Sequence, residues 1–307
     1  MGITTAVSER PAELRRSELA AFLRSRRSRI SPADAGLPAG RRRRTAGLRR
    51  EEVAQLAGVG ITWYTWLEQG RPINASPQVL DAVARTLRLD PVEREHLFRL
   101  ALGPIAGGPE SHAVALGPQV RQILDQLSPL PASVTTERFD VLAWNRPFEV
   151  LHPRVCAAPP GERNSLYACF TKPACCSTYE NRDEQRTVLV AQLRAAYAHH
   201  LGEPAWTSFI QRMEALSPEF RSAWASQDVA HPHSLRKVFR HPEFPRLSMT
   251  STSMALQNHP GTRLVVYTPD DAETRRAIEY LVTSKSEKHF PCWSVHQREL
   301  AATGHSS

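Results

Sequence analysis

The sequence predicts two domains: an all-α N-terminal domain of five helices, residues 1–102, and an α+β C-terminal domain, residues 119–283. Three observations support this division. Five helical patterns with start and stop signals follow one another up to residue 102. A stretch rich in Gly and Pro, residues 103–118, is typical of a linker. Beyond it, helical patterns are mixed with alternating runs typical of strands. Residues 284–307 carry no strong pattern and are expected to form a mobile tail.

The first helix is predicted at residues 12–30, where apolar residues recur on one face and Arg fills the other. The apolar positions are Leu19, Phe22, Leu23 and Ile30. A loop rich in Pro, Gly and Arg follows at residues 31–48. It contains four consecutive arginines, Arg41, Arg42, Arg43 and Arg44. These are either a solvated charge run or an arm that meets a polyanion.

Glycines separate and end the next two helices. The second helix is expected to begin near Arg49 and to end at Gly58, where a tight turn requires a positive φ. The third runs from Gly60 to Gln69 and is ended by Gly70. The side chains expected to point inward are Val53, Leu56 and Ala57 in the second helix, and Tyr64 and Leu67 in the third.

Two N-cap residues, each followed by a proline, open the fourth and fifth helices. They are Ser76-Pro77 and Asp90-Pro91. The apolar positions that follow are Leu80, Val83 and Leu87 in the fourth helix, and Leu97 and Leu100 in the fifth. Five short helices over this length are typical of a compact DNA-binding module.

The C-terminal domain is expected to open with a helix at residues 119–127, whose inner face holds Val120, Ile123, Leu124 and Leu127. Two short strands are expected within residues 133–144. Helices follow to about residue 225, with the best patterns at residues 183–200 and 204–216. Three strands, residues 235–240, 246–256 and 262–268, and a helix at residues 272–282 complete the domain.

The net charge of +8 lies almost entirely in the first third of the chain. Residues 1–104 hold 18 Arg and 11 acidic side chains, whereas residues 105–307 hold 21 basic and 20 acidic side chains. This asymmetry indicates a module that meets a polyanion.

Several classes of protein are disfavoured by the sequence. No apolar run approaches the roughly 20 residues of a membrane span, and residues 1–16 lack the apolar region of a signal peptide. We therefore expect no membrane span and a cytoplasmic location. The five Cys and twelve His show no spacing typical of a metal site, and no catalytic motif occurs. We expect neither a metal nor catalytic residues, and the protein is not expected to be an enzyme.

Residues 49–71 carry the main functional motif. Its characteristic positions are Ala54, Gly58, Val59, Tyr64, Leu67, Glu68 and Gly70. Ala54 is small where two helices would cross, and Gly58 would form the turn between them. This pattern resembles the helix-turn-helix of the XRE-type phage-repressor family. In such a motif the second helix lies in the major groove, and its N-terminal residues face the base edges. The resemblance implies sequence-specific binding of double-stranded DNA.

The resemblance assigns roles to individual residues. The residues that would face bases are Ile61, Thr62, Thr65 and Trp66. Arg50 lies where the family binds phosphate, and Gln69 and Arg71 lie where it grips the DNA backbone. The arginines Arg41 to Arg44 are expected to reach phosphates or a minor groove. Glu68 is expected to pair inside the protein. At least one of Trp63 and Trp66 is expected to be exposed.

Further motifs are spread over residues 17–283. They are Trp144-Asn145-Arg146, Pro160-Gly161-Glu162-Arg163-Asn164, Ser217-Pro218-Glu219-Phe220, His241-Pro242 and Leu264-Val265-Val266-Tyr267, together with the helix-turn-helix segments. In combination they resemble the MmyB-like regulators, which join this helix-turn-helix to a PAS-like ligand-binding domain. The resemblance implies a sheet flanked by helices around an apolar cavity. The cavity would hold a fatty acid or another lipophilic small molecule.

Aromatic and soft side chains of the C-terminal domain can line either a core or a pocket. The candidate ligand-binding residues are Trp144, Asn145, Phe148, Phe170, Phe209, Phe220, Phe239 and Met249. A plain core position stays the alternative for each. Asn145 directly follows a strand and is expected to cap a helix. Arg194, on an amphipathic helix, is expected to face solvent.

The sequence therefore predicts a transcription regulator that binds an operator as a homodimer and responds to a small-molecule effector. The alternative is a regulator whose C-terminal domain binds a partner protein. An exposed apolar patch would favour that alternative.

Overall fold

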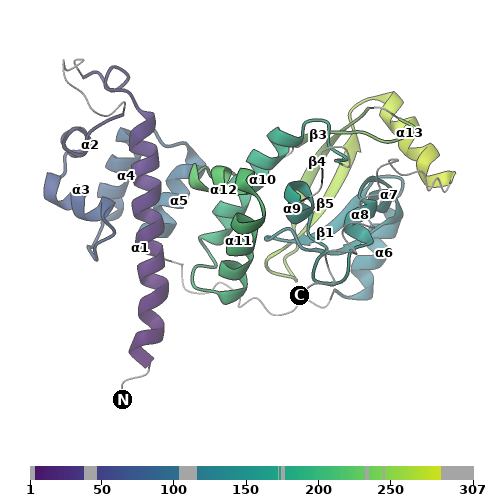
Figure 1. The fold of residues 1–307 in the computed structure, drawn as a ribbon, viewed down its shortest axis with the longest axis horizontal. Coiled ribbons are helices and arrows are strands. Elements are labelled where there is room, and N and C mark those ends of the chain that lie inside the picture. The colour runs from purple at the N-terminus through teal and green to yellow at the C-terminus, as the bar shows by residue number, and fades with distance from the viewer. Residues whose placement is uncertain are drawn as a thin grey trace. The chain divides into compact units, whose positions relative to one another are not determined.

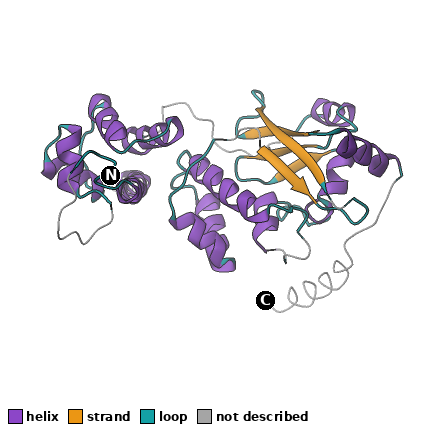
Figure 2. Cartoon of the chain, turned by 90° about the horizontal axis from the view of Figure 1, so that it is seen from above, coloured by secondary structure: helices purple, strands orange, loops and turns teal. Residues whose placement is uncertain are grey.

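The computed structural model describes residues 4–37, 47–103, 116–171, 173, 177–231, 235–244 and 246–284. Contacts divide the chain into two compact units, drawn in Figures 1 and 2. Unit 1 comprises residues 1–108 and 190–231, and unit 2 comprises residues 109–189 and 232–307. The arginines Arg41 to Arg44, most of the predicted linker and nearly all of the predicted tail lie outside the described residues.

Unit 1 opens with the five predicted helices. They are α1 (Thr4–Arg29), α2 (Arg50–Ala57), α3 (Ile61–Glu68), α4 (Pro77–Thr86) and α5 (Pro91–Leu102). The start of α1 was predicted at residue 12, eight residues too late. Pro11 lies inside the helix, and proline is normally excluded from a helix interior because it lacks the N–H donor. The pattern before Pro11 therefore gave no helical signal.

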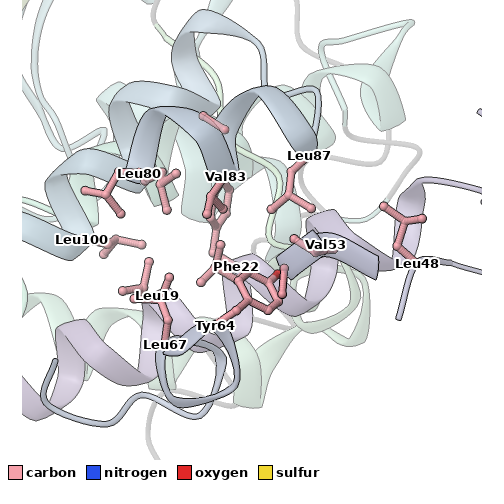
Figure 3. Packing of buried hydrophobic residues seen from close by; sticks show 14 of the residues in the cluster. Leu19, Phe22, Leu48, Val53, Tyr64, Leu67, Leu80, Val83, Leu87 and Leu100 are labelled. Carbon is pink, nitrogen blue, oxygen red and sulfur yellow. The ribbon is translucent and has the colours of Figure 1, made fainter. Parts of the chain in front are cut away.

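The buried core of these helices contains the predicted apolar positions (Figure 3). Leu19 and Phe22 of α1 pack with Tyr64 and Leu67 of α3. The core is completed by Leu80 and Val83 of α4, by Leu87 directly after α4, and by Leu97 and Leu100 of α5. The prediction for Leu56 is wrong, because its side chain is 42% exposed. The inner face of α2 is formed by Val53, Ala54 and the half-buried Ala57, and Leu56 lies to one side of it.

The helix ends follow the predicted chemistry. Gly58 has φ +68°, and its N–H bonds the carbonyl groups of the last turn of α2. A side chain on Gly58 would meet no atom within 4 Å, so only its backbone conformation requires glycine. Gly70, with φ +71°, would in addition place a Cβ 2.9 Å from the carbonyl oxygen of Arg16. Ser76 and Asp90 cap α4 and α5 by accepting N–H bonds from Val79 and Glu93.

Three more helices carry residues of unit 1. They are α10 (Arg182–Tyr197), α11 (Pro204–Leu216) and α12 (Pro218–Ala225). The boundary between the units falls inside α10, so residues 190–231 belong to unit 1. They contact α1 through Arg194 and Asp228, and α5 through His231, whose Nε2 lies 2.8 Å from Glu95. Leu201, Val229 and the buried Ala198 of this segment adjoin the core shown in Figure 3.

Two buried arginines hold residues 190–231 within unit 1. Arg26 of α1 pairs with Glu93 (3.1 Å) and Asp228 (3.2 Å), and it donates to the carbonyl oxygen of Gln227. Arg194 of α10 pairs with Glu18 (2.8 Å) and lies over the Trp224 ring, 3.8 Å from its centroid. Both side chains are 1% exposed. The expectation that Arg194 faces solvent is therefore wrong, since a carboxylate of α1 neutralises it inside the protein.

Unit 2 is built on a β-sheet, drawn in orange in Figure 2. The sheet has five antiparallel strands in the order β2-β1-β5-β4-β3. The strands are β1 (Ala132–Thr136), β2 (Val141–Trp144), β3 (Leu235–Phe239), β4 (Leu247–Ala255) and β5 (Thr262–Pro269). All five were predicted, with bounds that differ by one residue or so. The α+β fold class of the C-terminal region is confirmed.

Helices cover both faces of this sheet. They are α6 (Pro118–Gln126), α7 (Arg146–Leu151), α8 (Pro153–Cys156), α9 (Ser165–Thr171) and α13 (Ala272–Thr283). On one face, Leu124 of α6 packs with Ala132, Val134, Ala143 and Val266. The other face packs against α7, α8 and α13. Ile123 was predicted to point inward, but it is 53% exposed because α6 presents Leu124 to the sheet.

Candidate DNA-binding and ligand-binding sites

The helix α3 has one buried and one exposed face. Tyr64, Leu67 and Glu68 are buried, while Ile61 is 51% and Trp66 is 41% exposed. Thr62 and Gln69 are also exposed, and Thr65 is half-buried between them. The predicted base-facing residues therefore lie on the outward side of α3. Trp63 packs partly against the core, so the expectation that one of the two tryptophans is exposed is confirmed.

Glu68 fixes the position of α3. Its carboxylate accepts hydrogen bonds from Arg27 of α1 (2.7 Å, twice) and from Arg50 of α2 (2.9 Å). The expectation that Glu68 pairs inside the protein is confirmed. Arg50 keeps a side chain that is 41% exposed at the first residue of α2. It can therefore hold Glu68 through Nε and still offer its other nitrogens outward.

The residues after α3 continue the same surface. Arg71 is exposed, and its guanidinium carbon lies 5.9 Å from the centroid of the Trp66 ring. Its backbone N–H bonds the carbonyl oxygen of Trp66 at 3.0 Å, which places Arg71 directly after α3. The N-cap of α3, Gly60, provides no side-chain cap. The first N–H groups of α3 are thus left without a capping side chain, as a phosphate-facing helix end would be.

Some of the candidate ligand-binding residues lie together in unit 2. Phe148, Phe239 and Met249 are buried in one apolar cluster on the sheet face that packs against α7 and α8, and Trp144 lies partly buried beside them. Phe170 of α9 is also buried, with the Arg186 guanidinium 5.1 Å from its ring centroid. These residues can line a pocket between the sheet and the helices, or they can form a solid core.

The other two aromatic candidates lie in unit 1. Phe220 of α12 is buried and stacks on Trp224 with a centroid distance of 5.8 Å, and Phe209 of α11 is half-buried. The structure does not bring them into the cluster with Phe148.

Asn145 has a structural role. Its Oδ1 accepts from the N–H groups of Phe148 (3.2 Å) and Ala132 (2.9 Å), and its Nδ2 donates to the carbonyl oxygens of Leu124 and Leu130. All four hydrogen bonds of the amide are thus used. The expected helix cap is confirmed, since Asn145 is the N-cap of α7.

Four polar residues in or beside the apolar cluster were not predicted as site residues from the sequence: His152, Tyr179, Lys237 and Tyr267. His152 lies between α7 and α8, and its ring is within 6 Å, centroid to centroid, of the rings of Phe148, Tyr179, Phe239 and Tyr267. Lys237 could have been found from the strand pattern. It precedes Phe239 by two residues and so shares its face of the strand.

No helix in the described ranges is long and apolar enough to cross a membrane. The same ranges hold no cluster of His, Cys, Asp or Glu side chains that could bind a metal ion.

Comparison with protein families covers both parts of the chain. A model described as a helix-turn-helix domain matches residues 18–97, which span most of α1 to α5. The fold and the outward face of α3 thus define a DNA-binding regulator of the helix-turn-helix class. A second model, the MmyB-like transcription regulator ligand binding domain, matches residues 116–281, more than half of the 307 residues. The chain belongs to the family of MmyB-like transcription regulators.

The second match includes residues 190–231, although these residues pack within unit 1. Both family models describe binding domains rather than enzymes. Among curated proteins, none matches the chain.

Proposed function

We propose that the protein controls transcription by binding its operator through α3 as a homodimer, and that a lipophilic, fatty-acid-like molecule in the C-terminal domain controls this binding. The observation that carries the proposal is the outward row of Ile61, Thr62 and Trp66 on a helix fixed by Glu68. Dimers of this class read half-sites about one helical turn apart. In this proposal the protein acts in the cytoplasm and is not an enzyme.

The DNA contacts divide into two kinds. Ile61, Thr62, Thr65 and Trp66 read the base edges, whereas Arg50, Gln69 and Arg71 hold the backbone. The arginines Arg41 to Arg44, outside the described residues, would add phosphate contacts. The exposure of Arg50 and Arg71 beside the exposed face of α3 supports this division.

The ligand would lie between the sheet and α7 to α9. The candidates that the fold brings there are Trp144, Phe148, Phe170, Phe239 and Met249. Aromatic and methionine side chains suit an apolar ligand because they offer large and polarisable contact area. Asn145, Phe209 and Phe220 are less suited, because the first is a saturated cap and the other two lie in unit 1.

Arg50→Ala tests the DNA contacts. The variant should weaken binding to every DNA sequence and reduce the magnitude of the negative slope of log K against log salt by about 1, since one phosphate contact is lost. A fluorescence anisotropy titration at several salt concentrations measures this slope. Arg85→Ala, which removes an exposed arginine of α4, should leave the slope unchanged. An unchanged slope in Arg50→Ala contradicts the phosphate role.

Native mass spectrometry of the purified protein tests the ligand. The expected result is a copurified lipophilic molecule, or a melting temperature that rises when fatty acids of increasing chain length are added. If neither occurs, the sensor proposal fails, and a regulator that binds a partner protein becomes the better reading.

A further inference from the structure

One turn of α1 contacts two other parts of unit 1 on opposite sides. The turn consists of Arg24, Ser25, Arg26 and Arg27, near the C-terminal end of α1. Residues three apart in a helix lie on the same face, so the first and last of these side chains leave α1 on one side. The two side chains between them leave on the other side. The two pairs therefore bind different parts of the protein.

The outer pair binds the end of α3. Arg24 Nη1 donates to the carbonyl oxygen of Glu68, the last residue of α3, at 3.2 Å, and Arg27 donates twice to the Glu68 carboxylate at 2.7 Å. Directly after α3, the backbone of Gly70 lies so close to α1 that a Cβ would be 2.9 Å from the carbonyl oxygen of Arg16. The C-terminal end of α3 is thus fixed to α1 by charged hydrogen bonds and by backbone packing.

The inner pair binds a segment that follows α12, residues 226–228, here called the docked segment. Ser25 Oγ donates to the carbonyl oxygen of Ser226 at 2.9 Å. Arg26 donates to the carbonyl oxygen of Gln227 and, at 3.2 Å, to the carboxylate of Asp228. Every residue of the docked segment therefore bonds to α1, although the partners are 201 or 202 residues apart in the chain.

The docked segment has a constrained conformation. Gln227 has φ +63°, directly after the C-cap of α12, where glycine is the usual residue. Its side chain is also held, because Oε1 accepts a hydrogen bond from Arg194 of α10 at 2.9 Å. Within the segment, Ser226 Oγ donates to Asp228 at 2.8 Å. A left-handed residue that is fixed by contacts on several sides has a defined position, and such residues concentrate at switch regions.

The contacts join two regions of the family. The docked segment lies in the ligand-binding region, residues 116–281, whereas the turn of α1 and the whole of α3 lie in the helix-turn-helix region, residues 18–97. Arg26 is 1% exposed, so water and salt screen its contacts little. One helical turn thus connects the docked segment to α3 through an unbroken series of hydrogen bonds, as coupling between distant sites requires.

We propose that the docked segment positions α3 for base reading, because it holds the turn of α1 that in turn holds Glu68. Ser226, Gln227 and Asp228 are positioning residues, since they act through α1 and not on the DNA. This role rests on the proposed base reading by α3 and adds a dependence to it. Release of the docked segment lowers the affinity for the operator although no DNA contact is removed.

The double variant Ser25→Ala/Asp228→Asn tests this role. It removes the hydroxyl that binds Ser226 and the charge that binds Arg26, while Glu93 still pairs with Arg26. Fluorescence anisotropy of the full-length protein compares an operator, selected with the wild type from a random library, with a shuffled duplex of the same length. The operator affinity should fall at least about fivefold, the lower end of ordinary coupling between sites. The affinity for the shuffled duplex should change less than about twofold, because it depends on phosphate contacts and not on the orientation of α3 toward the bases.

Asp81→Asn is the control. Asp81 of α4 pairs with two arginines, as Asp228 does. This variant removes the same charge from unit 1 without touching the docked segment, and it should change the ratio of the two affinities by less than about twofold. Urea unfolding verifies that each variant is folded under the conditions of the titrations. If the double variant is not folded, Ser25→Ala and Asp228→Asn are measured singly, and each should lose part of the ratio.

The outcomes distinguish positioning from plain stabilisation. A stabilising role would lower both affinities by the same factor, because it acts through the fraction of folded protein, and this result contradicts the proposal. An unchanged ratio contradicts it as well, and so does a rise in operator affinity, which would make the docked segment a restraint on α3. If the wild type does not distinguish the two duplexes, the proposed base reading fails and the positioning role fails with it.

Discussion

Glu68 joins three helices of unit 1 through one buried carboxylate. Burial acts to raise the pKa of Glu68, but the hydrogen bonds and charges of Arg27 and Arg50 outweigh it, and the pKa is lowered. The carboxylate is therefore ionised in the folded protein. It connects α1 and α2 to α3, so the orientation of the proposed reading helix depends on one acidic residue.

Replacing Glu68 with Gln should strongly destabilise unit 1. Breaking a buried pair leaves an uncompensated charge, here on Arg27, and costs about 3–5 kcal/mol. Urea unfolding measures the free energy of unfolding. Glu51→Gln removes an exposed carboxylate of α2 and should change it by less than about 0.5 kcal/mol. An effect of Glu68→Gln as small as that of its control would show that the pairing contributes little.

His96 of unit 1 and His152 of unit 2 are both buried, and each has a ring nitrogen without a hydrogen-bond partner among the described residues. Neither ring nitrogen of His96 has a hydrogen-bond partner within the described ranges, and its ring lies edge-on to Phe22. Burial, and then the positive charges of Arg194, Arg99 and Arg26, lower the pKa of His96 to about 3. His96 in unit 1 and His152 in unit 2 thus both stay neutral well below the ordinary pKa of 6.5.

These histidines predict a loss of stability in mild acid. The unfolded chain binds the two protons near pH 6.5, whereas the folded protein binds them only near pH 3. Stability is therefore retained above pH 6.5 and falls as the pH drops toward 3, by about 1.4 kcal/mol per pH unit for each histidine. Urea unfolding between pH 7.5 and 4.5 gives the slope of the unfolding free energy against pH. This slope should be smaller in His96→Leu and in His152→Leu than in the wild type. His199→Leu, at an exposed position, should retain the wild-type slope. Unchanged slopes in the first two variants would refute the assignment.

At the scale of elements, the composition of α3 determines what it can read. Ile61–Glu68 contains no Arg, Lys, Asn or Gln, the side chains that bond guanine or adenine in bidentate fashion. Its two exposed large side chains, Ile61 and Trp66, are apolar or nearly so. The apolar group that bases offer in the major groove is the methyl group of thymine. We therefore expect α3 to select A·T or T·A pairs at the centre of each half-site.

Uracil substitution tests this expectation directly. An operator is first selected from a random DNA library, and its central thymines are then replaced one at a time by uracil, which removes only the methyl group. Each methyl that Ile61 or Trp66 contacts should contribute about fourfold in affinity, from about 0.8 kcal/mol per buried methyl-sized group. The effect should disappear in Trp66→Ala at the position that Trp66 reads. Thymines outside the half-sites serve as controls. A selected consensus of G·C pairs under α3 contradicts the assignment.

The order of the helices and strands could be predicted because their ends carry local chemistry. Gly58, Gly70, Ser76 and Asp90 each act where the sequence places them, and the strand alternation located β3 to β5. The wrong predictions of burial concern residues at the edge of the apolar face of a helix. Leu56 and Ile123 lie beside the apolar stripe of their helices, where burial depends on the width of the packing partner. Periodicity within one helix does not contain that information.

At the scale of the whole molecule, neither the burial of the two arginines nor the meeting of His152 with Lys237 could be predicted. Arg26 and Asp228 are 202 residues apart in the chain, and His152 and Lys237 are 85 apart. Only tertiary packing brings each pair together. An Arg on an amphipathic helix is most often solvated, and its sequence neighbours give no sign of the opposite case.

A substitution in the family's ligand-binding region should therefore loosen the N-terminal helices. Arg194→Met removes the partner of Glu18 and the contact with Trp224, both inside unit 1. Hydrogen exchange measured by mass spectrometry should be faster in α1 and α5 of this variant, because residues 190–231 no longer hold them as firmly. Arg221→Met, at an exposed position of α12, provides the control. Equal exchange in α1 and α5 for both variants would mean that Arg194 does not stabilise them.

The packing of residues 190–231 also constrains how regulators of this architecture can be recombined. A chimera that joins residues 1–103 to the C-terminal region of a relative brings in a foreign counterpart of Arg194, Gln227 and Asp228. Glu18, Arg26 and Glu93 then face residues with which they did not evolve. A chimera that keeps these contacts has to exchange residues 190–231 together with the first five helices. The structural unit that contains the helix-turn-helix is therefore encoded by two separate stretches of the gene.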